Sequence, residues 1–431
     1  MKIVGIDIGT TSICGVLIDA VSGKLLKSIT KNSDAFIKTD NDWEKIQSPQ
    51  IIVDKAICIL NELVDDDCAA IGVTGQMHGI VYYDNTGNAV SPLYTWQDGR
   101  GNQPYKNTTY AKYLNSYSGY GNITDFYNRT NGLILNSAVG FCTIHDYFVM
   151  KLSNTMQPTI HSTNAASFGL YDLSSNAFSI KNGIKTVNDY CIAGYYKNIP
   201  VSVAIGDNQA SVFSTLTDEN KILLNVGTGS QISVVSENII EAENIETRPY
   251  FDGKYLIVGA ALCGGRAYST LKNFYFEIIK LFKEDISDDD IYSAMDKALT
   301  DKPVTSLNVD TRFDGSRANP EIRGSITNLS ENNFTFSDMT SGVLNGIVEE
   351  LHNMFNIMSV CKSGLVGSGN GIRKNKHLIR IAERVFNSDM IIPIHTEEAA
   401  FGAAMFAAIS ANVFKNYRDA QSIIKFEKHK V

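Results

Sequence analysis

The feature that most constrains the fold is a pair of similar segments placed half a chain apart. Residues 3–17 read IVGIDIGTTSICGVL, and residues 221–235 read KILLNVGTGSQISVV. At an offset of 218 residues (227 − 9), Gly9-Thr10 falls on Gly227-Thr228 and Asp7 falls on Asn225. Half of the 431-residue chain is about 215 residues, so the pattern indicates one folding unit that occurs twice.

Each copy predicts a hairpin whose tip can bind phosphate. A short apolar run enters a turn of Gly, Thr and Ser, and a second apolar run leaves it. Such a turn presents backbone N–H groups and hydroxyls, which suit phosphate oxygens. A single Gly-Thr turn is also typical of an ordinary hairpin. The matched pair favours two tips that face each other and clamp a polyphosphate.

Length and composition exclude several classes of protein. The chain is 44% apolar and 19% charged, which is typical of a globular protein. Its net charge of −8, without a Lys/Arg cluster, argues against a nucleic-acid partner. No apolar run approaches the ~18 residues that would indicate a membrane span, and Asp7 interrupts the first apolar run too early for a signal peptide.

The cysteines indicate a cellular compartment. The seven residues are scattered, their number is odd, and no CxxC pair occurs. This usage favours reduced core thiols over a disulfide framework or a zinc site. The sequence therefore predicts a cytoplasmic protein.

The order of apolar runs predicts two α/β domains, at 1–216 and 217–431. In the first, Ser48-Pro49 starts a helix to about Leu63, and strands are expected at 69–73, 80–83 and 201–205. Residues 100–195 are rich in Asn, Tyr and Ser and are predicted to form an insertion that covers a cleft. In the second, helices are expected at about 338–358 with Ser337 as cap, at about 375–385, and from Glu397 with Thr396 as cap.

Two aspartates at predicted strand ends are candidate catalytic groups. Asp7 lies beside the first Gly-Thr turn, where a carboxylate can hold Mg²⁺ near nucleotide phosphates, although it could instead form an Asx-turn. Since its counterpart is Asn225, one shared metal would need only the carboxylate of Asp7. Asp207 opens the run GDNQAS and could accept a proton from a substrate hydroxyl. A helix N-cap role for Asp207 is an equally good interpretation.

Polar residues at two other predicted strand ends suit a sugar. Gln76 and His78 follow one strand, and Trp96, Asp98 and Arg100 lie in the run WQDGR. An aromatic ring packs on sugar C–H bonds while amide, imidazole and carboxylate groups bind hydroxyls. Taken alone, His78 is more typical of a buried structural histidine, and Asp98 with Arg100 also fits a structural ion pair.

A glycine-dense segment, GLVGSGNG at 364–371, is expected to form a loop between two helices. Missing side chains let a flat ring or a phosphate approach the backbone. The segment matches neither a dinucleotide-binding fingerprint nor a Walker loop. By itself it does not identify a nucleotide site.

As a set, the motifs resemble the FGGY family of carbohydrate kinases. In chain order they are DIGTTS at 7–12, GQMHG at 75–79, WQDGR at 96–100, GDNQAS at 206–211, GTGSQIS at 227–233, VGSGNGIRKN at 366–375 and EEAAFGAA at 397–404. They span nearly the whole chain. The resemblance implies an α/β, actin-like ATPase (ribonuclease H-like) fold, with two duplicated domains around a central cleft.

The resemblance also implies a role for each motif, with ATP and Mg²⁺ as cofactors. Asp207 is expected to be the catalytic base, and Asp7 to lie at the Mg-ATP site. The implied nucleotide residues are Gly9, Thr10, Thr11, Ser12, Gly227, Thr228 and Gly229 around the phosphates, and Gly367, Ser368, Gly369 and Asn375 around adenine and ribose. The implied sugar residues are Gln76, Met77, His78, Trp96, Asp98, Asp207 and Asn208.

Within the family, GQMHG resembles the kinases of ketoses more than those of glycerol. Three segments, TWQDGR at 95–100, TIHDY at 143–147 and NAASFG at 164–169, favour sedoheptulose over D-xylulose. The stretch 181–199 looks shorter than the corresponding stretch in the family, which affects the predicted insertion that covers the cleft. We therefore expect ATP-dependent phosphorylation of the terminal primary hydroxyl of a ketose, with sedoheptulose first and D-xylulose second.

Two other classes of function are open alternatives. A non-catalytic sugar sensor or scaffold would be expected to lack a catalytic carboxylate or a loop glycine, yet Asp7, Asp207 and the glycine-rich segments are present. An actin-like ATPase without a sugar acceptor would leave GQMHG and WQDGR unexplained. Members of the family often form dimers, so a homodimer is one expected assembly, and neither nucleic acid nor a membrane is expected as a partner.

Overall fold

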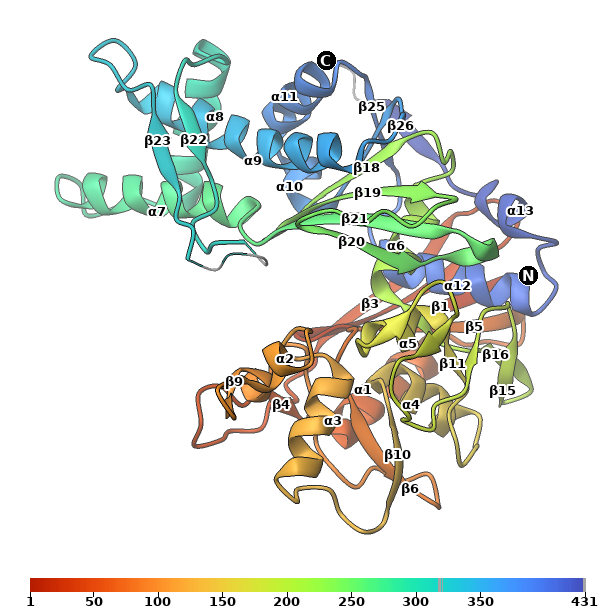
Figure 1. Cartoon of the computed structure of the whole chain (residues 1–431). Helices are drawn as coiled ribbons and strands as arrows, with labels where there is room; N and C mark the ends of the chain where they lie inside the picture. Colours follow the sequence, from red (N-terminus) through yellow and green to blue (C-terminus); the bar gives the residue numbers. More distant parts are fainter. Residues whose placement is uncertain (317–318, 320, 429–431) are drawn as a thin grey trace. The chain divides into compact units, whose positions relative to one another are not determined.

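The computed structural model describes residues 1–316, 319 and 321–428, which form two compact units (Figure 1). Unit 1 consists of Met1–Thr217, Arg248–Lys254 and Glu397–Lys425. Unit 2 consists of Asp218–Thr247, Tyr255–Thr396 and the described chain from Phe426. The predicted boundary after residue 216 lies beside the first change of unit, but the prediction for 217–431 did not foresee that residues 397–425 pack into unit 1.

Unit 1 is built on a mixed sheet with β1 at its centre. The strand order is β15-β16-β5-β1-β2-β3, and β17 also pairs with β5. The strands are β1 (Lys2–Ile8), β2 (Ser12–Asp19), β3 (Leu25–Asn32), β5 (Cys68–Gly75), β15 (Ile192–Tyr196), β16 (Ile199–Ser202) and β17 (Ile205–Gly206). Strands β5, β16 and β17 run parallel to β1, whereas β2 is antiparallel to it.

Unit 2 contains a second mixed sheet, in the order β20-β21-β19-β18-β24-β25-β26. Its strands are β18 (Ile222–Val226), β19 (Ser230–Ser236), β20 (Ile245–Pro249), β21 (Tyr255–Ala261), β24 (Leu365–Ser368), β25 (Met390–Pro393) and β26 (Phe426–Lys428). Strand β18 is antiparallel to β19 and parallel to β24. This arrangement repeats that of β1 with β2 and β5, so the predicted duplication is present in the strand topology.

The two hairpin tips differ in length. In the first hairpin Ile8 pairs with Ile13, which leaves Gly9 to Ser12 in the tip. In the second, Val226 pairs with Ser230, which leaves only Gly227 to Gly229. The duplicated unit therefore carries one shorter and one longer turn.

Helices and short strand pairs complete both units. The helices of unit 1 are α1 (Pro49–Leu63), α2 (Tyr110–Tyr113), α3 (Gly121–Thr130), α4 (Ile144–Leu152), α5 (Ser162–Ser167), α6 (Asp207–Thr215), α12 (Glu398–Ser410) and α13 (Tyr417–Gln421). Those of unit 2 are α7 (Gly265–Lys280), α8 (Asp288–Asp301), α9 (Phe336–Met358), α10 (Gly369–Lys374) and α11 (Lys376–Phe386). The short strands are β4 (Ile46–Gln47), β6 (Val81–Asp84), β7 (Leu93–Tyr94), β8 (Pro104–Tyr105), β9 (Thr108–Thr109), β10 (Ala138–Cys142), β11 (Ile160–His161), β12 (Tyr171–Asp172), β13 (Ala177–Phe178), β14 (Thr186–Val187), β22 (Asn308–Asp310) and β23 (Ser325–Thr327).

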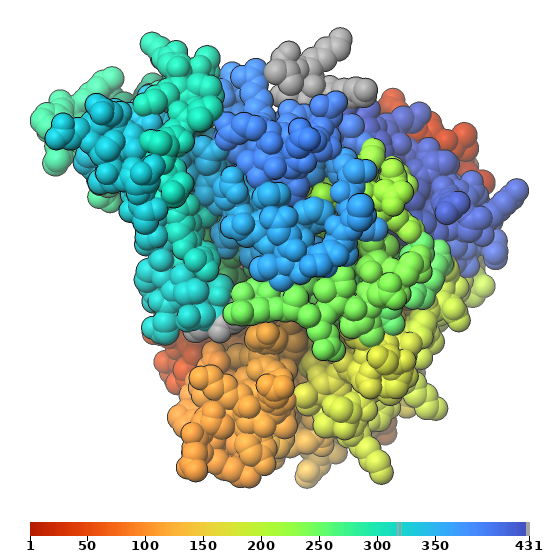
Figure 2. Space-filling view, turned by 45° about the horizontal axis from the view of Figure 1, so that its top comes forward, coloured from red at the N-terminus to blue at the C-terminus, as the bar shows by residue number. Residues whose placement is uncertain are grey.

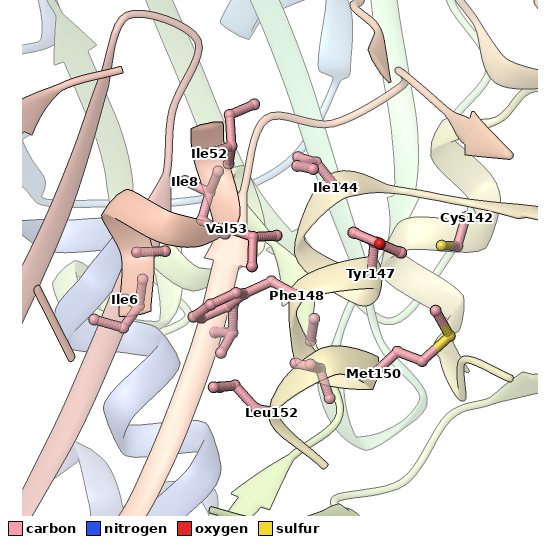
Figure 3. Packing of buried hydrophobic residues seen from close by; sticks show 14 of the residues in the cluster. Ile6, Ile8, Ile52, Val53, Cys142, Ile144, Tyr147, Phe148, Met150 and Leu152 are labelled. Carbon is pink, nitrogen blue, oxygen red and sulfur yellow. The ribbon is translucent and has the colours of Figure 1, made fainter. Parts of the chain in front are cut away.

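The core of unit 1 forms where helices α1 and α4 cover the central strands. Ile6 and Ile8 of β1 belong to one buried cluster with Ile52 of α1 and Phe148 of α4 (Figure 3). Phe148 is fully buried. Burial of these apolar side chains favours folding by about 1.5–3 kcal/mol for each large residue. This core holds the carboxyl ends of β1 and β5 in place.

Helix α12 packs on the sheet of unit 1 although it lies near the end of the chain (Figure 1). Gly5 of β1 and Gly72 of β5 are paired, and a Cβ on them would lie 1.8 and 1.9 Å from the carbonyl oxygens of Ala400 and Ala403. Gly402 of α12 faces α6 in the same way. These three glycines allow the backbones to approach closely.

The predicted insertion at 100–195 carries most of the short elements of unit 1. It contains α2, α3, α4 and α5, and its surface is the orange and yellow region in Figure 2. Within the described parts of the chain, no helix is long and apolar enough to cross a membrane.

The ends of several elements differ from the sequence-based expectations. The Ser48-capped helix α1 is confirmed, with the Ser48 hydroxyl accepting from the N–H of Ile51. The long helix α9 is capped by Thr335 instead of Ser337, and Glu397 instead of Thr396 occupies the N-cap position of α12, without a side-chain hydrogen bond.

Two further segments differ from the expectations, one predicted as a loop and one as a continuous strand. The segment 364–371 is not a loop, because β24 pairs with β18 and β25 and α10 starts directly after it. Pairing between distant strands outweighs the local preference of glycine here. The strand expected at 201–205 is interrupted, with β16 ending at Ser202 and β17 beginning at Ile205.

Candidate active site

The predicted catalytic residues of unit 1 gather at one edge of its sheet. Asp7 of β1 is in register with Thr74 of β5, and Gly206 of β17 is in register with Gly75. These strands are parallel, so their carboxyl ends meet at the same edge, where α/β proteins commonly bind ligands. Asp207 and the loop after Gly75 therefore lie beside Asp7.

Asp7 is a carboxylate with an incomplete set of partners. Its Oδ1 atom is buried and has no hydrogen-bond partner among the described residues. Burial, together with the negative charges of Asp207 and Glu397, raises the pKa of Asp7 to about 7. The alternative Asx-turn role is not what the structure shows, because Asp7 pairs within β1 and β2. A buried carboxylate oxygen without a donor suits a hard cation.

Asp207 begins helix α6, whose N-cap position is Gly206. One carboxylate oxygen of Asp207 accepts a hydrogen bond of 2.7 Å from the N–H of Asn208. Burial raises the pKa of Asp207 to about 6, although that N–H and the charge of Arg248 oppose the shift. The N-cap interpretation of Asp207 is therefore wrong. A partly buried carboxylate with a pKa near neutrality is suited to general-base catalysis.

The first hairpin tip is joined to two predicted sugar residues. The Thr10 hydroxyl donates to Oε1 of Gln76 at 3.2 Å and accepts from Nε1 of Trp96 at 3.0 Å. Gln76 Nε2 donates to Oε1 of Gln47, and Gln47 Nε2 donates to the carbonyl oxygen of Thr10. Trp96 is 47% exposed, whereas Gln76 is buried. The indole is open to a ligand, while the amide of Gln76 is engaged within the protein, so its role as a direct sugar ligand stays a prediction.

His78 lies in the loop after β5. Its backbone φ is 73°, its ring stacks on Tyr120 with centroids 4.3 Å apart, and its Nδ1 lies 2.8 Å from the carbonyl oxygen of Ser167. Met77 is buried and its side chain packs on Gly206. Thus the loop 76–78 contacts the segment that carries Asp207.

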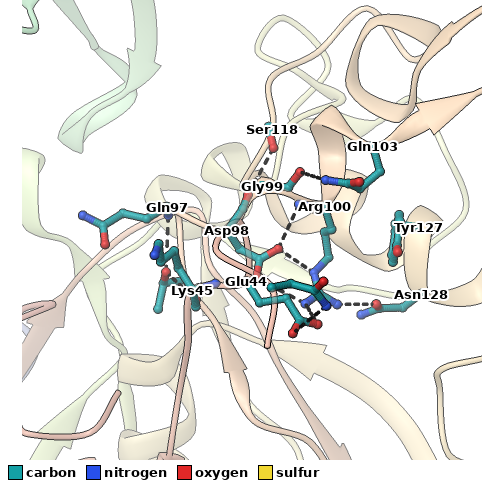
Figure 4. A network of polar contacts seen from close by, with 12 residues as sticks. Glu44, Lys45, Gln97, Asp98, Gly99, Arg100, Gln103, Ser118, Tyr127 and Asn128 are labelled. Carbon is teal, nitrogen blue, oxygen red and sulfur yellow. Dashed lines mark hydrogen bonds and ion pairs between the residues drawn. The ribbon is translucent and has the colours of Figure 1, made fainter. Parts of the chain in front are cut away.

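Asp98 and Arg100 form a buried ion pair (Figure 4). Asp98 accepts hydrogen bonds from the Nε, Nη2 and backbone N–H of Arg100 and from the backbone N–H of Lys45. Arg100 also donates to Asn128 at 2.7 Å and lies over the ring of Tyr94. The carboxylate of Asp98 is saturated by protein donors, which favours the structural interpretation over a direct sugar contact.

Asn208 lies next to Asp207 and accepts a hydrogen bond of 3.1 Å from Arg248. The positive charge of Arg248 also lowers the pKa of Asp207, against the effect of burial. The pair Asp207-Asn208 is thus framed by one arginine of unit 1. The sequence motifs did not indicate this arginine.

Unit 2 contains a cavity of about 810 Å³ at the second hairpin tip. Four predicted nucleotide residues line it: Gly227, Thr228, Gly369 and Asn375. The other lining residues include Arg266, Tyr268, Tyr292, Asp296, Gly371 and Lys374, which the sequence reasoning did not select. Gly371 and Lys374 could have been found, because both lie inside the motif VGSGNGIRKN.

Three other predicted nucleotide residues do not line this cavity. A Cβ on Gly367 would lie 2.5 Å from Sδ of Met390, so the glycine permits close packing of β24. The Ser368 hydroxyl accepts from Nδ2 of Asn225 at 2.8 Å. Gly229 accepts from the N–H of Gly227 within the tip. Asn225, the counterpart of Asp7, thus holds a neighbouring strand.

Asn375 has two structural roles, because it lines the cavity and is also the N-cap residue of α11. Its side-chain oxygen accepts from the backbone N–H groups of His377 and Leu378, at 3.0 and 3.1 Å. An Asn cap is worth about 0.5–2 kcal/mol. The lining includes both glycines and the aromatic rings of Tyr268 and Tyr292, a combination that suits a flat base and its ribose.

The surroundings of Asp7 suit a Mg²⁺ ion that is held mainly by water and phosphate. Across the described ranges, no group of three or more His, Cys, Asp or Glu side chains could hold a metal ion. Mg²⁺ in kinases is commonly held by one or two carboxylates together with water and substrate phosphates. The unpaired Oδ1 of Asp7 could be such a single carboxylate ligand. The described residues do not provide a site in which protein side chains alone surround the ion.

Duplicated α/β units, two carboxylates at a sheet edge and a glycine-lined cavity together favour a phosphotransferase that acts on a small molecule. Comparisons with known proteins narrow this class. Models of the FGGY family of carbohydrate kinases match residues 2–186 with the N-terminal domain and residues 222–411 with the C-terminal domain.

Individual relatives agree with the family match. Sedoheptulokinase of Mus musculus is 28% identical, over 93% of this chain and 96% of the relative. Xylulose kinase of Staphylococcus xylosus is 25% identical, over 97% of this chain and 92% of the relative. The crystal structure of xylulose kinase from Rhodospirillum rubrum aligns with a TM-score of 0.84 at 17% identity, over 99% of this chain and 93% of that chain.

The chain belongs to the FGGY family of carbohydrate kinases. It has the two-domain actin-like (ribonuclease H-like) fold of this family and is an ATP-dependent sugar kinase. The expected fold class and class of reaction are therefore confirmed.

Proposed function

We propose that this kinase phosphorylates the terminal primary hydroxyl of a ketose, with sedoheptulose as the preferred substrate and Asp207 as general base. The carrying observation is the position of Asp207 beside Asp7 at the carboxyl edge of the first sheet, with its pKa raised to about 6. The similarity to sedoheptulokinase over nearly the full length of both chains supports the choice of sugar.

Asp207 supplies the proton acceptor for the reaction. The sugar hydroxyl attacks the γ-phosphorus of ATP, and its proton passes to the carboxylate. Near pH 7 a carboxyl with a pKa of about 6 is mostly ionised and still basic enough to take the proton. The hydrogen bond from the N–H of Asn208 orients the carboxylate.

Asp7 would hold Mg²⁺ through its buried Oδ1, directly or through water. When bound there, the ion supplies neutralisation of phosphate charge. The backbone N–H groups and hydroxyls of the first hairpin tip, Gly9 to Ser12, would bind phosphate oxygens. The cavity of unit 2 would take adenine and ribose between its glycines and tyrosines.

The sugar would lie against the exposed indole of Trp96, with His78 and Asn208 as hydrogen-bonding groups. Met77 and Gln76 are buried beside this site, since Gln76 bonds Thr10 and Met77 packs on Gly206. Asp98 supports the sugar site indirectly, because its carboxylate fixes the backbone at Lys45 and Arg100.

D-xylulose is the second candidate substrate. Xylulose kinases match this chain both in sequence and in fold. A panel of sedoheptulose, D-xylulose, L-xylulose, D-ribulose and fructose, with glycerol as control, separates the candidates in a coupled ADP assay. A clear preference for a pentulose would replace sedoheptulose and leave the class of reaction unchanged.

The substitution Asp207→Asn tests the general base. We expect kcat to fall by about 10²–10⁴-fold, because a positioned proton acceptor is lost while the shape of the side chain is kept. Binding of ketose and ATP should persist in calorimetry. Retention of most of the wild-type turnover would remove Asp207 from this role.

A homodimer and a cytoplasmic location complete the proposal. All seven cysteines are free thiols, as expected for a reducing compartment. Light scattering of the purified chain distinguishes a monomer from a dimer.

A further inference from the structure

The backbone of His78 takes a conformation that residues other than glycine seldom adopt. Its φ of 73° lies in the left-handed region, directly beyond the end of β5. Such a conformation costs energy and persists only where the surrounding structure holds it. The contacts that hold His78 are therefore of functional interest.

Ser167, the last residue of α5, holds His78 at two points. The Ser167 hydroxyl accepts from the backbone N–H of His78 at 3.1 Å, and it donates to the carbonyl oxygen of Asn164 at 2.7 Å. The carbonyl oxygen of Ser167 lies 2.8 Å from Nδ1 of His78. Since a carbonyl oxygen only accepts, Nδ1 carries the proton, and in the neutral ring Nε2 is the acceptor nitrogen.

The other end of α5 holds the residue before Asp207. The Thr163 hydroxyl accepts from the backbone N–H of Gly206 at 3.1 Å. Nδ2 of Asn164 donates to the carbonyl oxygen of Ala204 at 3.0 Å. Thr163 and Asn164 are fully buried, so water cannot replace these bonds.

Helix α5 is itself anchored by a buried polar network. Nδ2 of Asn164 donates to Asp146 at 2.8 Å, and its Oδ1 lies 2.9 Å from Nε2 of His145. The Thr143 hydroxyl donates to the second oxygen of Asp146 at 2.7 Å. The segments TIHDY and NAASFG thus form one network, which gives α5 a fixed position.

We propose that Ser167 and Thr163 are positioning residues of the sugar site, and that α5 sets the placement of His78 relative to Asp207. This rests on the proposed function, in which His78 binds a sugar hydroxyl and Asp207 takes a proton. Ser167 fixes the loop and the ring tautomer of His78. Thr163 fixes the peptide from which Asp207 projects.

Four variants test this arrangement by steady-state kinetics with the full chain. Ser167→Ala removes the hydroxyl that holds the His78 backbone, and Thr163→Val removes the acceptor for Gly206 without changing the side-chain shape. Thr163→Ser retains that acceptor. Ser162→Ala is the matched control, because Ser162 is a buried serine of the same helix and its hydroxyl makes neither bond.

We expect Ser167→Ala to raise the KM for the ketose and to lower kcat/KM for it by about 10–100-fold, the loss expected from a misplaced binding group. Thr163→Val should lower kcat by about tenfold or more. Both variants should keep the KM for ATP within about twofold, and Thr163→Ser and Ser162→Ala should behave as the wild type. The opposite result, with Ser167→Ala and Thr163→Val unchanged or with Ser162→Ala equally impaired, overturns the proposal.

Nitrogen NMR of the histidine rings separates this proposal from the proposed function. Signals of His78 are assigned with His78→Gln, and His352 of α9 serves as the internal control. We expect the wild type to show the Nδ1–H tautomer of His78, and Ser167→Ala to shift these signals but not those of His352. A wild type without activity on any ketose would end the proposed function, and unchanged His78 signals in Ser167→Ala would end the positioning role. If Ser167→Ala does not fold, Thr163→Val and Thr163→Ser decide the question kinetically.

Discussion

At the scale of single residues, two carboxylates of the same sheet edge differ in what surrounds them. Asp207 has a hydrogen bond from Asn208 and the nearby charge of Arg248, whereas Asp7 has a buried oxygen without a donor. Burial raises both pKa values, and the negative charge of Asp207 raises the pKa of Asp7 further. The charge of both carboxylates therefore changes with pH in the range near neutrality.

The pH dependence of turnover should follow the ionisation of Asp207. The proposed base acts only as a carboxylate, and the pKa of Asp207 is about 6. We expect kcat/KM for the ketose to fall about tenfold per pH unit well below pH 6 and to level off above pH 7. A rate that is flat from pH 5 to pH 8, in protein shown to be folded, would argue against this assignment.

Asp7→Asn should stabilise the metal-free protein at alkaline pH. The pKa of Asp7 is raised from 3.8 to about 7 in the folded state, so its contribution to stability is complete below about pH 4 and is lost as pH rises through 7. Asn carries no charge, so at pH 8 the free energy of unfolding of the variant, measured by urea titration, should exceed that of the wild type by about 1–3 kcal/mol. At pH 4 the two proteins should have the same stability.

The control for Asp7→Asn is Asp54→Asn, on the exposed face of α1. Addition of Mg-ATP should stabilise the wild type more than Asp7→Asn, because only the wild type offers the carboxylate to the ion. Equal stabilisation of both proteins would contradict a metal site at Asp7.

At the scale of elements, the close approach of α12 to the first sheet depends on paired glycines. A Cβ at Gly72 would lie 1.9 Å from the carbonyl oxygen of Ala403, and backbone atoms cannot move aside as a flexible side chain can. We expect Gly72→Ala to lower the free energy of unfolding by at least about 1–3 kcal/mol, the usual cost of overpacking. Ser410→Ala, at the end of the same helix, should be nearly neutral in the same urea titration.

Local patterns predicted some elements well and others poorly. Ser48-Pro49 marks the start of α1 because the cap and the fixed φ of proline act within one turn. The segment 364–371 was expected to be a loop, because its glycines disfavour regular structure locally. Its residues Leu365–Ser368 form β24 because β18 and β25 pair with them from distant parts of the sequence, and α10 begins at Gly369.

At the scale of the whole molecule, the first unit is not contiguous in sequence. Glu397–Lys425 pack with the first 217 residues, and α12 covers β1 and β5. A sequence divided at its midpoint assigns these residues to the wrong side. Folding of unit 1 therefore needs residues Glu397–Lys425, which follow most of unit 2 in the sequence.

A chain that ends at Thr396 should fail to form unit 1. Loss of α12 would expose the face of the first sheet that carries Gly5 and the buried side chain of Ile3, and we expect insoluble protein on expression. A matched chain ending at Lys425 keeps α12 and removes β26 onward, so it should stay soluble and bind the ketose in calorimetry. A soluble, ketose-binding protein from the shorter chain would show that α12 is dispensable.

By itself, the sequence determined the duplicated hairpins, the first Gly-Thr tip and the pair Asp7 and Asp207 at strand ends, because turn residues and apolar runs act over a few positions. Only the tertiary structure decided that Asp98 is saturated by Arg100, that Asn225 holds Ser368 and that Ser167 holds His78. Each of these outcomes is a hydrogen bond whose geometry depends on how neighbouring elements pack. The sequence gives only the residue type. It does not show whether an Asp carboxylate or a His imidazole forms its hydrogen bonds with protein groups or with a ligand, so the local pattern cannot distinguish a structural residue from a ligand-binding one.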